Sequence, residues 1–196
     1  MNRLTPRLVD RGALTAAYVG MGMAITIAIS FLLIIPIEPI VWLLALPSGM
    51  LIGYYANQRS DRRAGPLGRI LANGLFAALL TGLTMAVLLL GVKALFFFAD
   101  NGYRDPGLGG PITCEPGGDC VYQRYLDLGR GPDLEAAGLT DVASFTSFYW
   151  GQQGSAAALI LGVTTLGGLV GAGLYAITRP RDRPGTAVGS VAPPRT

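Results

Sequence analysis

Long, nearly uncharged stretches of apolar residues recur four times along this sequence. They cover residues 13–35, 39–56, 70–98 and 154–178. A helix needs about 20 apolar residues to cross the roughly 30 Å hydrocarbon core of a bilayer. The pattern therefore predicts an all-α integral membrane protein with four transmembrane helices, the first two forming a hairpin over residues 13–56.

The start of the chain shares one feature with a secretory signal, because Arg3, Arg7 and Arg11 precede the first apolar stretch. That stretch is too long for the apolar region of a signal, and no convincing small-residue cleavage site lies before Glu38. We therefore expect it to remain in the chain as an anchor.

Prolines shape the second apolar stretch. Pro36 and Pro39 flank Ile37-Glu38 and predict a tight turn, after which a helix begins at Pro39. Pro47 removes one backbone hydrogen bond within that helix and predicts a bend over residues 43–47. Such a bend serves either as a functional hinge or simply for packing.

Charge divides the chain into two sides. Residues 1–12, 57–69 and 179–196 hold eleven Arg against three Asp, whereas the turn at Glu38 and the loop over residues 99–153 hold nine acids against three Arg. Basic residues flank membrane spans on the cytoplasmic side. We therefore expect a cytoplasmic N-terminus, Arg-rich loop and disordered tail, with the long loop extracytoplasmic. The preference for Arg over Lys, with abundant Ala, Gly and Pro, favours a bacterial origin and thus the bacterial inner membrane.

Two cysteines lie in the long loop. Cys114 and Cys120 flank the turn-forming run Glu-Pro-Gly-Gly-Asp, on the side of the membrane that is oxidising. A disulfide is the simplest interpretation. The alternative is a thiol oxidoreductase, but such sites normally use Cys-x-x-Cys and further cysteines as relays, and neither is present.

The second half of the long loop has helical patterning. Thr140 is placed to cap a short helix over residues 141–150 that leads into the fourth span. An earlier short helix would carry an apolar face, and both helices are expected to rest on the membrane surface. The residues of that face are Val121, Tyr122, Tyr125, Leu126 and Leu128.

Small residues recur at helical spacing in the last three spans and predict close helix packing. The partner helix can belong to this chain or to another subunit. The residues are Gly49, Gly53, Gly74, Ala78, Gly82, Gly167 and Gly171.

Lys93 is the only charge inside a predicted span, five residues before Phe98. We expect its long side chain to reach the headgroups at the outer surface; the alternatives are a carboxylate partner or a lipid phosphate. At the inner side a dense group of arginines marks topology and could bind anionic headgroups without catalysis. These are Arg59, Arg62, Arg63 and Arg69.

The residue inventory excludes much chemistry. With no His and only two Cys, the chain cannot assemble the usual zinc site, haem ligation or Ser-His-Asp triad. No Asp or Glu lies in a predicted span, which disfavours a proton relay. The formal net charge of +3 is concentrated beside apolar stretches and does not imply nucleic acid. We expect no catalytic residue, cofactor or metal, and no enzymatic activity.

The leading hypothesis is a noncatalytic accessory or scaffold subunit of a larger membrane complex. It would pack through its Gly-rich helices against lipids and other integral membrane subunits, and present an acidic outer loop. One alternative is a small transporter or channel using Lys93 and the bend at Pro47; another is an enzyme acting on lipid or quinone. The layout is similar to that of tetraspanins, but their Cys-Cys-Gly signature is absent, so no family is assigned.

Overall fold

The structure is a computed structural model that describes residues 9–34, 38–60, 65–99 and 114–179. Every regular element in these ranges is a helix, and four of the helices are long and apolar enough to cross a membrane. The structure therefore confirms the predicted all-helical fold and the presence of four helices of this length and hydrophobicity.

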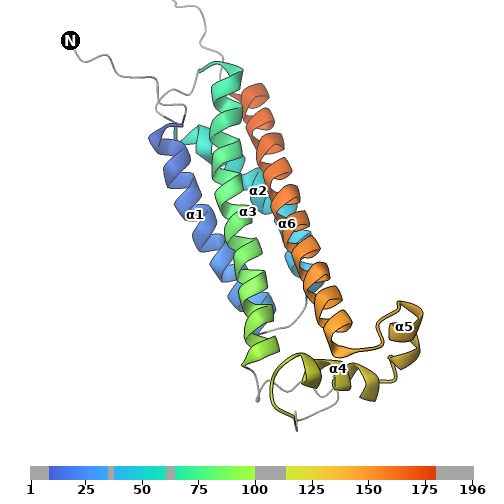
Figure 1. Ribbon diagram of the computed structural model, residues 1–196. Helices are drawn as coiled ribbons and strands as arrows, with labels where there is room; N and C mark the ends of the chain where they lie inside the picture. Colours follow the sequence, from blue (N-terminus) through green and yellow to red (C-terminus); the bar gives the residue numbers. More distant parts are fainter. Residues whose placement is uncertain (1–8, 35–37, 61–64, 100–113, 180–196) are drawn as a thin grey trace, which may run out of the picture.

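The four long helices form an up-and-down bundle in which consecutive helices run in opposite directions (Figure 1). α6 packs against both α2 and α3, and α1 packs against α2 and α3. The bounds are α1 Arg11–Ala28, continued by the π-helical η1 Ile29–Ile34, then α2 Glu38–Gln58, α3 Leu67–Phe98 and α6 Val142–Thr178.

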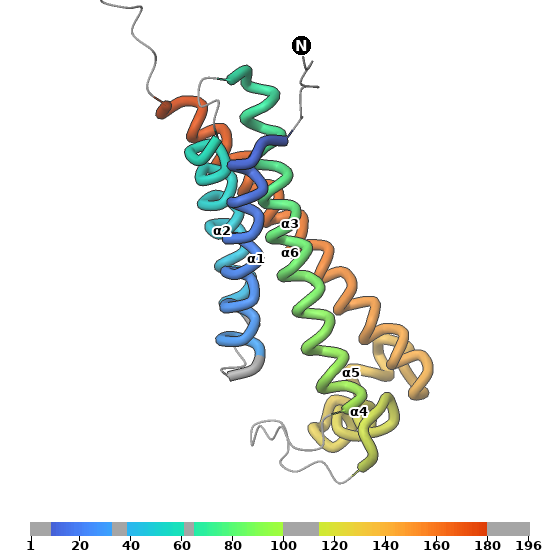
Figure 2. The backbone as a smooth tube through the Cα atoms, turned by 90° about the vertical axis from the view of Figure 1, so that its left-hand side faces the viewer, coloured from blue at the N-terminus to red at the C-terminus, as the bar shows by residue number. Residues whose placement is uncertain are grey.

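The two ends of the bundle differ (Figures 1 and 2). One end holds the start of α1, the connection between α2 and α3, and the end of α6; we call it the basic end, after Arg11, Arg59, Arg69 and Arg179. The other end carries two short helices, α4 Gly118–Asp127 and α5 Gly131–Ala136. We call residues 114–150, which include α4, α5 and the first turns of α6, the cap.

The interior of the bundle is built largely from small side chains. Ala16, Ala24, Ala45 and Ala77 are completely buried, and so is the larger Ile160, which packs in the same cluster as Ala24 and Ala45. Small residues let helix backbones approach closely, so that dispersion contacts accumulate along the whole length of each pair.

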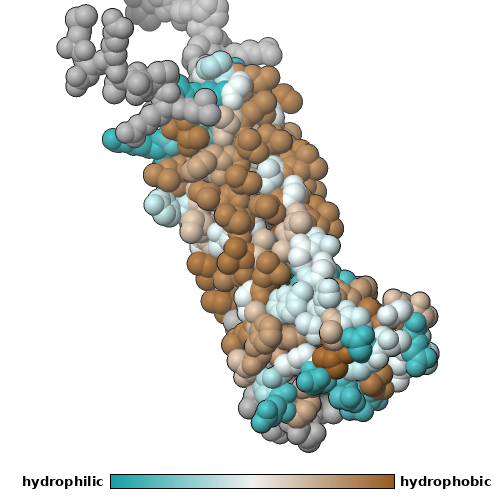
Figure 3. Space-filling model, in the orientation of Figure 1, coloured by the Kyte–Doolittle hydropathy of each residue, from teal (hydrophilic) through white to brown (hydrophobic). Residues whose placement is uncertain are grey.

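The outside of the bundle is apolar. Leu43, Leu51 and Ile177 are 73%, 65% and 80% exposed, and apolar side chains cover the flank of the bundle between polar ends (Figure 3). Soluble monomers rarely expose a continuous apolar surface of this extent. The exposed flank therefore suits a hydrocarbon environment.

The largest difference from the sequence-based expectation is the start of the last long helix. It begins at Val142, and Asp141 caps it where Thr140 was expected. At 37 residues, α6 is roughly 55 Å long, well beyond the thickness of a hydrocarbon core. The expected separate helix over residues 141–150 is therefore the first part of α6.

Other expectations differ in detail or fall outside the described residues. α1 ends in π-helical turns that no sequence signal indicated. α2 continues as one helix through Pro47, and it begins at Glu38 rather than Pro39. The tight turn expected at Pro36–Pro39 falls partly on residues 35–37, which lie outside the described residues, as does the tail over residues 180–196.

Candidate functional site

A network of polar side chains lies at the basic end and joins three helices. Asp10 precedes α1 and accepts a hydrogen bond from the backbone N–H of Ala13, the N-cap interaction that helix starts favour. Its other carboxylate oxygen accepts from the Ser60 hydroxyl, and from Asn73 Nδ2 at 3.1 Å. Asn73 also accepts from the Asp10 backbone N–H at 3.3 Å. Asp10 thus ties the start of α1 to the residues that follow α2 and to α3.

Asn57 is linked to this network through its carbonyl oxygen, which accepts from the backbone N–H of Ser60 at 3.2 Å. Its side chain is 1% exposed and donates from Nδ2 to the carbonyl oxygens of Gly53 at 3.0 Å and Ile70 at 2.9 Å. The first bond stays within α2, whereas the second crosses to α3. Buried amides of this kind fix the relative position of two helices, because losing either bond leaves a polar group unsatisfied.

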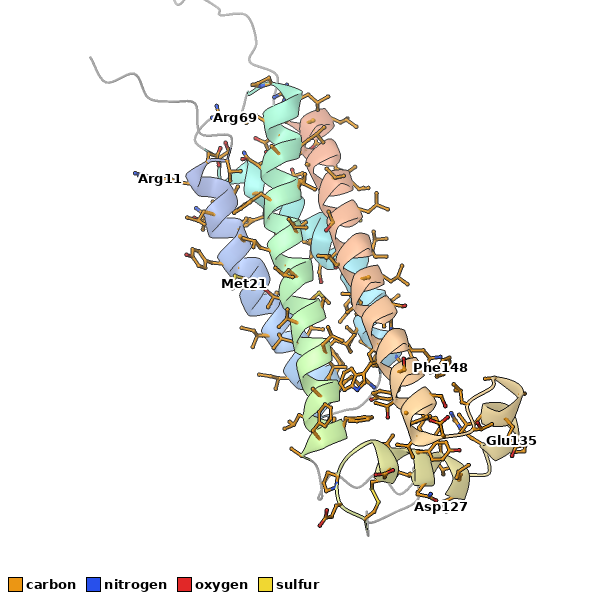
Figure 4. The ribbon with its side chains drawn as sticks, in the orientation of Figure 1. Arg11, Met21, Arg69, Asp127, Glu135 and Phe148 are labelled. Atoms are coloured by element: carbon orange, nitrogen blue, oxygen red, sulfur yellow. A yellow bond between two sulfur atoms is a disulfide. The ribbon has the colours of Figure 1, made fainter. Side chains whose placement is uncertain are left out.

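Four arginines lie at the same end of the bundle as this network. Arg11 and Arg59 are exposed, and Figure 4 shows Arg11 pointing away from the bundle and Arg69 at the same end, near the start of α3. Arg59 donates from Nε to the Tyr55 hydroxyl at 3.0 Å and lies over that ring. Arg179 donates to the Gly65 carbonyl oxygen at 2.8 Å. Arg62 and Arg63 lie outside the described residues.

The small residues singled out from the sequence lie inside the bundle, in contacts of α2 and α3 with α6. A Cβ on Gly53 would come within 2.7 Å of the Gly168 Cα, and one on Gly171 within 2.8 Å of the Met50 carbonyl carbon. Gly49 and Gly167 have similarly close backbone neighbours across the same pair of helices. These glycines are therefore engaged by the chain's own helices.

The small residues of α3 meet α6 in the same way. A Cβ on Gly74 would lie 2.6 Å from the Ala172 Cβ, and one on Gly82 would lie 3.1 Å from the Thr164 Cβ. Ala78 occupies the space beside Gly168. Thr164 is fully buried at this contact, and its hydroxyl makes no hydrogen bond to any described residue.

The two residues of the transport hypothesis lie apart from this network. Lys93 is half-buried in the last turns of α3, toward the cap, and Pro47 lies midway along α2. The aromatic residues at that end of α3 pack on α6 instead. Phe97 is buried and contacts the rings of Tyr149 and Trp150 at 5.0 and 5.3 Å between centroids.

The cap has an aromatic core of its own. Phe145 of α6 is 1% exposed and is contacted by Tyr122 and Tyr125 of α4, at 5.4 and 5.1 Å between ring centroids. Leu134 of α5 and Leu139 complete the cluster. Tyr122 and Tyr125 belong to the apolar face expected for this helix, whereas Leu128 lies beyond the end of α4 and is 37% exposed.

Two local features hold the cap in place. Cys114 and Cys120 form a disulfide that closes the approach to α4, and Cys120 is buried. Asp141 accepts hydrogen bonds from the backbone N–H and side chain of Ser144 and from the backbone N–H of Ala143, which lowers the pKa of its carboxyl below the ordinary value. Both features order the points where the chain enters a helix.

The described part of the cap is acidic on its surface. It carries two arginines, Arg124 and Arg130, against a larger set of mostly exposed acids. Figure 4 shows Asp127 and Glu135 at the far end of the molecule from Arg11 and Arg69. The acids are Glu115, Asp119, Asp127, Asp133, Glu135 and Asp141.

Among the described residues, the contacts at the basic end and in the cap are hydrogen bonds, ring contacts and close packing. Within the described ranges, no three His, Cys, Asp or Glu side chains come together as a metal site would require. Comparisons with protein families, curated proteins and solved structures found no match to this chain. Its fold and surface define a helical protein with four helices long and apolar enough to span a membrane, and with a packed cap at one end.

Sequence reasoning missed the polar network. In the sequence, Asp10 is one of the few acids among basic residues, and Asn57 and Asn73 are isolated polar residues. Nothing in the sequence links them, because 50 and 63 residues separate Asp10 from its partners Ser60 and Asn73. The one usable signal was the placement of each polar residue at a predicted span boundary.

Proposed function

We propose that this chain is a noncatalytic, multi-pass membrane protein that serves as an accessory or scaffold subunit. Its bundle spans the membrane with the basic end in the cytoplasm, and the cap stands outside as the surface that a partner recognises. The apolar flank and the separation of basic from acidic residues between the two ends support this placement.

The observation that carries the proposal is the construction of the cap. An ordered unit packed on Phe145 and closed by a disulfide presents exposed acids on a fixed framework. A pre-organised surface loses little conformational freedom when a partner binds. The acids suit a partner with a basic surface, because complementary charge speeds and orients association.

The interior of the bundle favours this role over transport. Thr81 and Thr164 are buried polar residues midway along the helices, but they lie at close contacts with Gly20 and Gly82. Glycine contacts of this kind bring helices together for packing. The bundle is therefore suited to hold the cap rather than to conduct a solute.

The placement can be tested by cysteine labelling of intact cells. In a Cys114→Ser/Cys120→Ser background, Asp127→Cys should react with a membrane-impermeant maleimide, whereas Arg59→Cys should react only after the membrane is opened. The opposite pattern would reverse the orientation, and labelling of both sites in sealed cells would argue against a membrane-spanning bundle.

The scaffold role needs a second experiment. After gentle detergent extraction, a stoichiometric partner should comigrate with the chain on a native gel, and Asp127→Lys/Glu135→Lys should release it. Arg124→Gln, also on the cap, is the matched control and should retain it. A chain that runs alone or as a small homo-oligomer would overturn the scaffold proposal.

A further inference from the structure

We propose that the basic end binds the headgroups of anionic phospholipids in the leaflet that it faces. This inference rests on the proposed membrane placement. It concerns four arginines that share one end of the bundle. Arg11 begins α1, Arg59 directly follows α2, Arg69 lies in the first turn of α3 and Arg179 directly follows α6.

The described residues of this end carry a net positive charge, with four arginines against one acid. Asp10 is the one acid that the described residues contribute here, and its carboxylate is taken up by Ser60, Asn73 and the N–H of Ala13. That set of bonds turns the acid toward the bundle interior. The net positive charge of the described residues gives this surface a positive potential.

The apolar neighbours of the arginines favour a lipid over a soluble acidic protein. Leu14 is 45% exposed, three residues after Arg11, and Leu67 is 57% exposed, two residues before Arg69. Ile177 is 80% exposed, two residues before Arg179. Arg11 and Leu14, three residues apart, share one face of α1, and the other two arginines lie at helix ends that also expose a large apolar side chain. A lipid offers both a charged headgroup and an acyl chain to such an end.

The geometry of Arg59 fits a phosphate in particular. Its Nε donates to the Tyr55 hydroxyl and the guanidinium lies 5.6 Å from the centre of that ring, so the side chain is held in one orientation. Its hydrogen bond to Tyr55 uses Nε, and the two terminal nitrogens form the two-pronged donor that matches phosphate oxygens. The neighbouring backbone is also fixed, because Gly12 packs directly on Arg59 and Ser60.

The test is native mass spectrometry of the full chain in detergent, with equal amounts of phosphatidylglycerol and phosphatidylcholine. The wild-type chain should retain phosphatidylglycerol preferentially. The preference should fall roughly fivefold for each arginine removed. The variants are the double variant Arg11→Gln/Arg59→Gln and the same variant with Arg69→Gln added. Arg124→Gln/Arg130→Gln on the cap is the charge-matched control and should keep the preference.

Different outcomes test the lipid surface and the proposed membrane placement. Equal retention of the two lipids by the wild type, or an equal loss in the cap control, overturns the lipid surface while the bundle still inserts into phosphatidylcholine vesicles. Failure to insert into such vesicles overturns the membrane placement itself. Circular dichroism of each variant shows whether the helical bundle is retained. The double variant Arg11→Gln/Arg59→Gln does not remove the hydrogen bond from Arg179 to Gly65, so that contact at the basic end stays in place.

Discussion

Asp10 shows how much of the architecture depends on single polar residues. It caps α1 and also receives hydrogen bonds from Ser60 and Asn73, so one carboxylate holds together three parts of the chain. Composition and spacing could place such a residue at a span boundary but could not identify its partners. Long-range pairing of this kind depends on the three-dimensional approach of helices, which a single sequence does not record.

Replacing Asp10 with Ala should therefore destabilise the fold by about 2–4 kcal/mol, since it removes a helix cap and bonds to a charged acceptor. Unfolding of the purified chain in detergent, followed by circular dichroism, measures the change. Asp141→Ala is the control, because Asp141 caps α6 without joining other helices, and it should lower stability less. Equal losses in the two variants would mean that the bonds to Ser60 and Asn73 add nothing.

At the scale of the helices, apolar stretches predicted the number and approximate position of the long elements. They failed at the start of α6, where Ser144, Gln152 and Gln153 interrupt the apolar pattern although the backbone hydrogen bonding continues. Hydropathy reports where a helix can contact hydrocarbon, whereas capping reports where it begins. The capping box of Asp141 and Ser144 was the better signal for that boundary.

The glycines of the bundle provide the corresponding test. Gly53→Ala should destabilise the bundle by about 1–3 kcal/mol, because the added methyl group meets the Gly168 backbone, which can give way only if α2 and α6 separate. Gly162→Ala is a matched control on α6 with open space around it, and should be neutral or stabilise by up to about 1 kcal/mol. Detergent unfolding of both variants distinguishes them. Similar behaviour would argue against the close contact at Gly53.

The whole molecule consists of two cores on shared helices. One is the Ala-rich and Gly-rich interior of the bundle, and the other is the aromatic cluster of the cap around Phe145. α3 and α6 extend past the α1–α2 hairpin and carry the cap beyond it (Figures 1 and 2). The sequence predicted the bundle from its apolar stretches, but the aromatic residues of the cap are scattered over α4 and α6, and their convergence on Phe145 was not foreseen.

Two separate cores imply that the cap can be lost without the bundle. Phe145→Ala removes a side chain that is 1% exposed and should destabilise the cap by about 3–5 kcal/mol. Hydrogen exchange should then show α4 and α5 losing protection while α2 and the second half of α6 keep theirs. Phe148→Ala, on the same helix but 42% exposed, should leave both patterns unchanged. Because the cap is the proposed recognition surface, Phe145→Ala should also release the partner from a chain that still resides in the membrane. Loss of protection throughout the bundle would instead show that cap and bundle fold as one unit.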